Sequence, residues 1–147
     1  MLTPSLEDYL EEIYRFSLST ENIRVTDISN RLNVSMPSVS KALTRLKDKE
    51  YINYEPYGNI SLTLKGKAFG KYLVERNKLL QEFLSLICSN CDIDVEAEAE
   101  AMEHYLSRST IDAMQGLVRF FQDNPDLYKQ FKFYIESRSA ESENNRS

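Results

Sequence analysis

Three side chains that can bind a metal ion lie close together around residue 100. Glu100, Glu103 and His104 are spaced at i, i+3 and i+4, so a helix over this stretch would place all three on one face. Two carboxylates and an imidazole on one face suit a divalent transition metal such as Mn²⁺ or Fe²⁺. The alternative interpretation is a solvated helix of low complexity, because glutamate alternates with alanine from Glu96 to Ala101.

A second pair of carboxylates lies near the N-terminus. Asp8 and Glu11 are spaced at i, i+3 on a helix predicted for residues 4–18, which Thr3 caps and Pro4 opens. The pair flanks an apolar face made by Leu6, Tyr9, Leu10 and Ile13. Carboxylates in such a place are more often solvated than ligating, so the residues alone leave open whether the two clusters share a metal ion.

The charge of the chain is divided between segments. The 147 residues include 18 basic and 23 acidic side chains, a net charge of −5, which by itself argues against a nucleic acid as the partner. Residues 31–76, however, hold nine basic and four acidic groups, a net of +5. Residues 1–30 (two against six) and 77–147 (seven against thirteen) have nets of −4 and −6. This asymmetry suggests separate surfaces for separate partners, unless the clustering is accidental.

The basic segment coincides with the pattern of a winged helix-turn-helix. A short helix over residues 27–32, with Thr26 as its N-cap, is separated by a three-residue turn from a helix that Pro37 opens. Alternating strands are predicted over residues 51–54 and 60–64, on either side of a Gly-Asn turn. A hairpin directly after the second helix of a helix-turn-helix is the wing of a winged helix.

The helix that Pro37 opens is expected to read DNA. Its N-terminal residues would face base edges in the major groove, where hydroxyls, a proline ring and a lysine can contact thymine methyls, guanine and phosphates. We expect Ser35, Pro37, Ser38, Ser40, Lys41 and Thr44 at the bases, and Arg45, Lys47, Tyr57 and Lys65 at the DNA backbone. A local basic surface is sufficient for counterion release, so the acidic total does not exclude DNA. A winged helix that contacts only proteins is the alternative.

The rest of the chain is predicted to be helical, which makes the fold class mainly α, with an N-terminal winged helix-turn-helix and a C-terminal all-helical domain. Helices are expected over residues 65–89, 95–106, from a cap at Ser109 to 121, and 125–137. The predicted domains are residues 1–71 and 72–137. The tail 138–147 has no apolar residue larger than alanine and is expected to be disordered.

Several other kinds of protein are disfavoured. No apolar run approaches the ~20 residues of a membrane span and the N-terminus is no signal peptide, so we expect a cytoplasmic protein. Cys88 and Cys91 form a CxxC without the second cysteine pair of a zinc site, so reduced cysteines are the simplest interpretation and redox sensing is the alternative. An enzyme is not expected, because the chain has neither two Glu-x-x-His motifs nor a G-x-S-x-G.

The sequence resembles the DtxR/MntR family of metal-dependent repressors, in its short manganese-responsive branch without a third, SH3-like domain. The resemblance is carried by the order of Asp8 and Glu11, the segment SVSKALTRL, the hairpin ending in LTLKGK, a long linking helix and E-x-x-E-H at residues 100–104. It implies an N-terminal winged helix, a helical dimerisation domain and a metal site at their junction. It also implies Mn²⁺ or Fe²⁺ as corepressor, a homodimer on a palindromic operator and repression of metal-uptake genes.

The resemblance assigns the metal ligands residue by residue, with one departure. The matching ligands are Asp8, Glu11, Glu100, Glu103 and His104, whereas the family's histidine on the linking helix falls on Asn77. A carboxamide oxygen is a weaker ligand than imidazole for these ions. Since the family's site is binuclear, we expect one good metal position and one weak or empty one, with altered selectivity. A metal-independent winged-helix dimer with a decayed site is the alternative.

The expected mechanism couples the metal to the DNA-binding geometry. Two chains would pair through the region from about residue 79 to 122 and the first helix. Without metal, the carboxylates of Asp8, Glu11, Glu100 and Glu103 would repel one another, so the two domains would sample several orientations. A bound cation would neutralise them and favour the orientation that fits successive half-sites of the operator.

Overall fold

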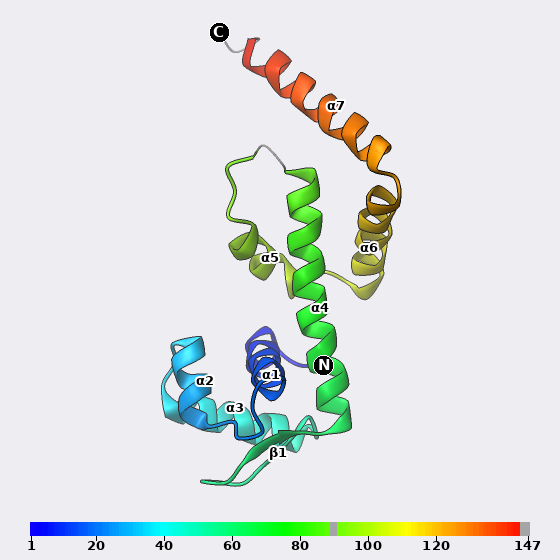
Figure 1. The fold of residues 1–147 in the computed structure, drawn as a ribbon. Coiled ribbons are helices and arrows are strands. Elements are labelled where there is room, and N and C mark those ends of the chain that lie inside the picture. Colours follow the sequence, from blue (N-terminus) through cyan, green and yellow to red (C-terminus); the bar gives the residue numbers. More distant parts are fainter. Residues whose placement is uncertain (89–90, 145–147) are drawn as a thin grey trace. The chain divides into compact units, whose positions relative to one another are not determined.

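The computed structural model describes residues 1–88 and 91–144, with side chains described as far as residue 140, and it divides into two compact units (Figure 1). The first unit is Met1–Glu75 and the second is Arg76–Ser147. Seven helices and two short strands are found in the described residues, which confirms the mainly α fold class. None of the helices described there is both long enough and apolar enough to cross a membrane.

The first unit is a winged helix-turn-helix, as predicted. Three helices come first, followed by a two-stranded hairpin and the start of a long helix: α1 (Pro4–Ser17), α2 (Val25–Leu32), α3 (Met36–Asp48), β1 (Ile52–Tyr54), β2 (Ile60–Leu62) and α4 (Leu64–Ile87). Thr3 caps α1 as expected, because its hydroxyl accepts a hydrogen bond from the Leu6 amide. The apolar core of this unit is drawn from all of these elements and includes Leu10, Ile13, Ile28, Leu43, Leu46, Ile60 and Leu73.

The turn between α2 and α3 presents the second helix to solvent. Asn33 ends α2 in the left-handed conformation, with φ 52°, which asparagine adopts more readily than most residues. Ser35 then caps α3 by accepting a hydrogen bond from the Ser38 amide. The predicted cap of α2 at Thr26 is wrong, because the helix already begins at Val25 and the Asp27 carboxylate accepts from the amide of Arg24.

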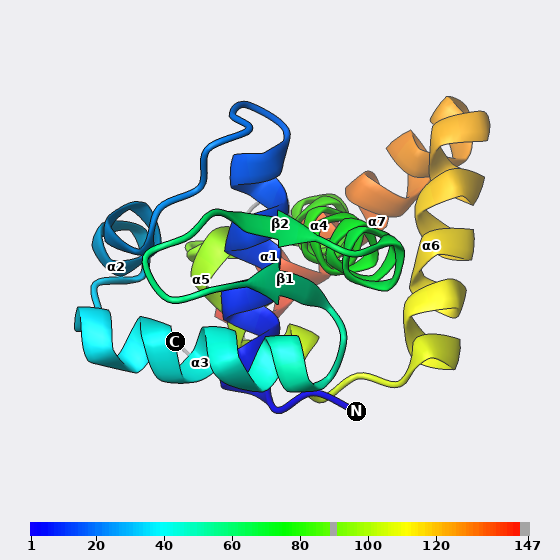
Figure 2. The ribbon, with the colours of Figure 1, turned by 90° about the horizontal axis from the view of Figure 1, so that it is seen from below.

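The hairpin packs one face onto the core and leaves the other in solvent. Its antiparallel register pairs Ile52 with Leu62 and Tyr54 with Ile60. The side chains of Ile52, Tyr54 and Ile60 are buried, whereas those of Asn53 and Ser61 between them are exposed, which is the alternation expected of a strand with one buried face. Figure 2 shows the two strands side by side, with α3 next to the hairpin.

The second unit consists of the remainder of α4 together with α5 (Val95–Glu103), α6 (Arg108–Asp123) and α7 (Pro125–Asn144). Its buried core is formed by Leu79, Leu80, Leu84, Ala99, Ile111 and Val118, which come from α4, α5 and α6. The predicted cap at Ser109 is wrong, since Ser107 caps α6 by accepting from the Thr110 amide.

The last helix is longer than expected. It continues to Asn144, so the residues 138–144 that composition predicts to be disordered are helical, and residues 145–147 lie outside the described part of the chain. No glycine or proline interrupts residues 126–144. The hydroxyls of Ser137 and Ser139 donate to carbonyls one turn earlier, as serines inside a helix do.

Candidate metal ligands and DNA-contacting surface

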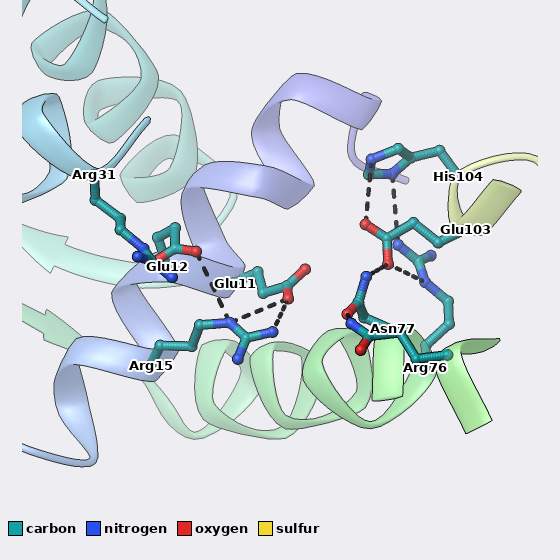
Figure 3. Close-up of polar contacts among 9 residues, drawn as sticks. Glu11, Glu12, Arg15, Arg31, Arg76, Asn77, Glu103 and His104 are labelled. Atoms are coloured by element: carbon teal, nitrogen blue, oxygen red, sulfur yellow. Dashed lines mark hydrogen bonds and ion pairs between the residues drawn. The ribbon is translucent and has the colours of Figure 1, made fainter. Parts of the chain in front are cut away.

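The second unit holds a buried carboxylate beside the imidazole. Glu103 is the last residue of α5, only 2% exposed, and His104 follows it as the C-cap. The Nε2 atom of His104 lies 3.6 Å from Oε1 of Glu103 (Figure 3). Each side chain offers one ligand atom, and the two atoms are close enough together to bind one cation.

Arg76 on α4 also contacts both of these side chains. Its Nε atom lies 4.0 Å from Oε2 of Glu103, and its Nη2 atom lies 3.5 Å from Nδ1 of His104 (Figure 3). The side chains of Arg76 and Glu103 are 5% and 3% exposed, so this is a buried ion pair. Because a guanidinium can only donate, Nδ1 is the acceptor in this contact.

Asn77 on α4 lies next to Glu103, and it turns its amino group rather than its amide oxygen toward that carboxylate. Its Nδ2 atom donates to Oε2 of Glu103 at 3.0 Å, and its Oδ1 atom accepts from Nε2 of Gln81 at 2.8 Å. Glu100, one turn before Glu103 on α5, is exposed. Within the second unit, the structure therefore brings Asn77, Glu103 and His104 together.

The two carboxylates predicted on α1 belong to the first unit. Asp8 is half-buried and Glu11 is 8% exposed. Glu11 already has a cationic partner, because Nη2 of Arg15 lies 2.6 Å from its Oε1 atom (Figure 3). Glu12 contacts Arg15 at 3.8 Å and Arg31 at 3.3 Å. The acidic face of α1 is thus partly neutralised by arginines of the same unit.

Several residues of these clusters were not predicted from the sequence, among them Arg15, Arg76 and Gln81. The signal for Arg15 is its position four residues after Glu11, where oppositely charged side chains meet on a helix. Gln81 likewise follows Asn77 by four residues. The contact of Arg76 with Glu103 joins α4 to α5, and no local spacing indicates it.

The candidate DNA-contacting surface is the exposed side of α3. Its exposed residues include Lys41 and Arg45, and neither makes an ion pair with another described residue. Ser35 and Ser38 hydroxyls lie 2.8 Å apart, while the Thr44 hydroxyl donates to the Ser40 carbonyl. The predicted residues Ser35, Pro37, Ser38, Lys41, Thr44 and Arg45 are all exposed, and Ser40 is half-buried. Sequence reasoning omitted Met36, which is 52% exposed at the start of the helix and offers an apolar contact for thymine methyls.

The wing provides a further exposed residue, Tyr57, at its tip, where φ is 61°. Two lysines expected at the DNA backbone have partners within the unit. Lys47 forms an ion pair of 2.8 Å with Glu55, and Lys65 donates to the Lys49 carbonyl at 2.7 Å. These two lysines are therefore less available to phosphates than Lys41 and Arg45.

The two cysteines are free thiols. Cys88 is half-buried and Cys91 is exposed. Burial raises the pKa of the Cys88 thiol above its ordinary value, and the hydrogen bond with Cys91 and the charges of Cys91 and Glu98 act in the same direction. A raised pKa disfavours the thiolate, which is the form that reacts.

Comparison with known proteins gives two family models that match the chain in succession. The iron dependent repressor N-terminal DNA binding domain matches residues 1–60, and the iron dependent repressor metal binding and dimerisation domain matches residues 63–132. The HTH-type transcriptional regulator MntR of Listeria monocytogenes is 41% identical over 132 residues, which cover 90% of this chain and 92% of that protein. The regulator of the same name from Oceanobacillus iheyensis is 40% identical over 136 residues, 92% of each chain.

Two regulators of known structure are also similar to this chain. The manganese regulator SloR superposes with a TM-score of 0.68 at 26% identity, and the metal-dependent transcriptional regulator MtsR with a TM-score of 0.69 at 27% identity. Each match covers 81% of this chain and 55% of the solved one, so this chain spans about half the length of those proteins. The relatives are transcriptional regulators rather than enzymes, which confirms both the resemblance and the prediction that this chain is no enzyme.

Proposed function

We propose how metal and DNA binding are connected in this chain, which belongs to the iron dependent repressor family. It is a metal-dependent transcriptional repressor of the MntR type, with an N-terminal DNA-binding domain and a C-terminal metal-binding and dimerisation domain. These domains make DNA, a second copy of the chain and a divalent metal its partners. The finer proposal concerns which residues bind, and what each does.

The proposed metal ligands come from both units. Asp8 and Glu11 on α1, with Glu100, Glu103 and His104 from α5 and its C-cap, supply carboxylate and imidazole ligands of the kind that Mn²⁺ and Fe²⁺ accept. A second metal position would need Asn77 as its ligand on α4, and a neutral carboxamide would make such a position weak. The observation that carries the proposal is the 3.6 Å approach of the Glu103 and His104 ligand atoms within the second unit.

The residues of this chain would link metal binding to DNA binding, and a bound cation would supply positive charge that several carboxylates can share. Glu103 and His104 hold their ligand atoms on the dimerisation domain, and Asp8 and Glu11 hold theirs on the DNA-binding domain. By holding one ion together, these residues would favour one arrangement of the two domains among those that the metal-free chain samples. In that arrangement the α3 helices of the dimer fit two half-sites of a palindromic operator. Repression of metal-uptake genes would then follow metal sufficiency.

DNA binding with and without metal tests this function. A duplex is selected from a random pool with the full chain and MnCl₂, and its affinity is then measured by fluorescence anisotropy in MnCl₂ and in EDTA. We expect binding to be tighter with Mn²⁺ by roughly 5–150-fold, the usual range of coupling between two sites. Equal affinity in EDTA would support the metal-independent regulator instead, and no selected sequence would contradict DNA recognition.

A matched pair of variants tests the DNA-contacting surface. Lys41→Gln removes an exposed charge from α3, so it should weaken binding and lower the slope of log affinity against log salt by about one. Lys129→Gln removes the same charge from an exposed position on α7 and should change neither value. The same loss in both variants would show that net charge, rather than α3, determines the binding.

A further inference from the structure

Asn77 lies where a metal ligand is expected on the linking helix, yet both ends of its amide are already engaged. The Nδ2 amino group donates to Oε2 of Glu103 at 3.0 Å, and Oδ1 accepts from Nε2 of Gln81 at 2.8 Å. Figure 3 shows the Asn77 side chain directed at the Glu103 carboxylate, with the dashed line between them. All three side chains belong to the second unit.

The direction of the amide follows from the chemistry of its neighbours. An ionised carboxylate can only accept hydrogen bonds, so the group that Asn77 turns toward Glu103 has to be its amino group. The amide oxygen, which is the atom that could bind a cation, then faces Gln81 and accepts a hydrogen bond there. Turning the Asn77 amide alone would set two oxygens against each other at Glu103 and two amino groups against each other at Gln81.

We propose that Asn77 is a positioning residue rather than a ligand: with Gln81 behind it, it orients the Glu103 carboxylate, and each chain binds one divalent cation instead of two. The assignment rests on the proposed function and specifies its metal site. Glu103 is 2% exposed, so its orientation is determined by the few groups that contact it. Groups that hydrogen-bond to a metal ligand orient it and typically change metal affinity 10–100-fold when they are removed.

One substitution distinguishes the two roles of Asn77 because they predict opposite results. Gln81→Met keeps the length of the side chain and removes its donor. If Asn77 orients Glu103, the substitution loosens that orientation and weakens Mn²⁺ binding about tenfold, still with one ion per chain. If Asn77 is instead a ligand, the substitution frees its oxygen, so Mn²⁺ binds more tightly or a second ion binds, and either result overturns the inference.

A second variant keeps the inference testable even where Gln81→Met folds poorly. Asn77→His replaces the amide by the imidazole that suits these ions, so we expect the number of bound Mn²⁺ ions to rise from one to two per chain. Ser85→Ala, at an exposed position one turn after Gln81 on α4, is the control and should leave affinity and stoichiometry unchanged. An Asn77→His chain that still binds a single ion would overturn the inference.

The measurement is a calorimetric titration of the full, metal-stripped chain with MnCl₂, with free Mn²⁺ counted in parallel by electron paramagnetic resonance. Thermal unfolding in EDTA shows whether each variant keeps the fold, independently of how many metal ions it binds. A wild-type chain that binds two Mn²⁺ ions with equal affinity overturns the role of Asn77 and leaves the repressor function intact. A wild-type chain that binds no Mn²⁺ overturns the proposed metal site itself.

Discussion

Replacing Glu103 with glutamine should destabilise the metal-free chain, because the carboxylate is already compensated within its own unit. The side chains of Arg76 and Glu103 are 5% and 3% exposed, with 4.0 Å between Nε and Oε2. Two unit charges at about 4 Å attract by about 4 kcal/mol at an effective dielectric constant of ~20. Removing one member of a buried pair costs about 3–5 kcal/mol, since the other charge stays buried. Glutamine keeps an oxygen that Asn77 can donate to, so we expect a loss of about 3 kcal/mol.

Urea denaturation in EDTA measures this loss, and far-UV circular dichroism is the probe because the chain has no tryptophan. Glu100→Gln removes the same charge one turn earlier on α5 at an exposed position and should stay within about 0.5 kcal/mol of wild type. If repulsion among the carboxylates dominated the metal-free state, both substitutions would stabilise the chain. A Glu103→Gln chain at least as stable as wild type would therefore refute the pairing with Arg76 as the source of compensation.

Two further predictions concern packing and thiol chemistry. Gly66→Ala should destabilise the first unit by at least about 3 kcal/mol, because its Cβ would lie 1.8 Å from a backbone carbonyl oxygen. A Cβ added at Gly116 on α6 would meet nothing within 4 Å, so Gly116→Ala should stabilise the chain by about 0.5–1 kcal/mol. Thermal unfolding of the two glycine variants measures both effects, and a Gly116→Ala chain less stable than the Gly66→Ala chain would contradict this packing. Burial is the main cause of the raised pKa of Cys88 and Cys91 is the next, so iodoacetamide at a pH of about 8 should label Cys91 before Cys88. Peptide mass spectra measure the labelling, and faster labelling of Cys88 would contradict the raised pKa. Because the pKa of Cys88 is higher in the folded chain than in the unfolded chain, folding favours the thiol form of Cys88. This contribution to stability is complete at a pH below the pKa of Cys88 in the unfolded chain, and it is lost as the pH rises through the pKa of Cys88 in the folded chain.

The helix-turn-helix could be predicted because its signals are local, whereas the N-caps of α2 and α6 could not. Ile23 forms a bridge with Ile60 of the wing and is 2% exposed, which holds the chain extended until the residue before α2. The helix therefore begins at Val25, before the threonine at 26 can cap it. Ser107, Ser109 and Thr110 all lie near the start of α6, and the structure uses the first of them as the cap, two residues before the predicted one.

Ligand types could be predicted from spacing, but the groups around them could not. The i, i+3, i+4 pattern predicts Glu103 and His104 as ligands, and the structure places Oε1 of Glu103 and Nε2 of His104 close together in the second unit. The expectation of mutually repelling carboxylates omitted the arginines: Arg15 follows from helix spacing, but Arg76 reaches α5 only through packing of the unit. Likewise, the residue type at Asn77 indicates a weak ligand, and only its hydrogen bonds indicate what the side chain does instead.

The contacts of Arg76 also imply that metal binding and the stability of the metal-free chain oppose each other. A cation that binds the Nε2 atom of His104 requires the ring proton on Nδ1, but Nδ1 now accepts from Arg76. Two donors would then face each other, and a dication held by Glu103 would repel the guanidinium beside that carboxylate. If Glu103 and His104 bind the metal as proposed, Arg76 would have to leave both side chains. The contacts that compensate Glu103 in the metal-free chain would then oppose metal binding, so the proposed site would fill only where the ion is abundant enough to replace an internal cation.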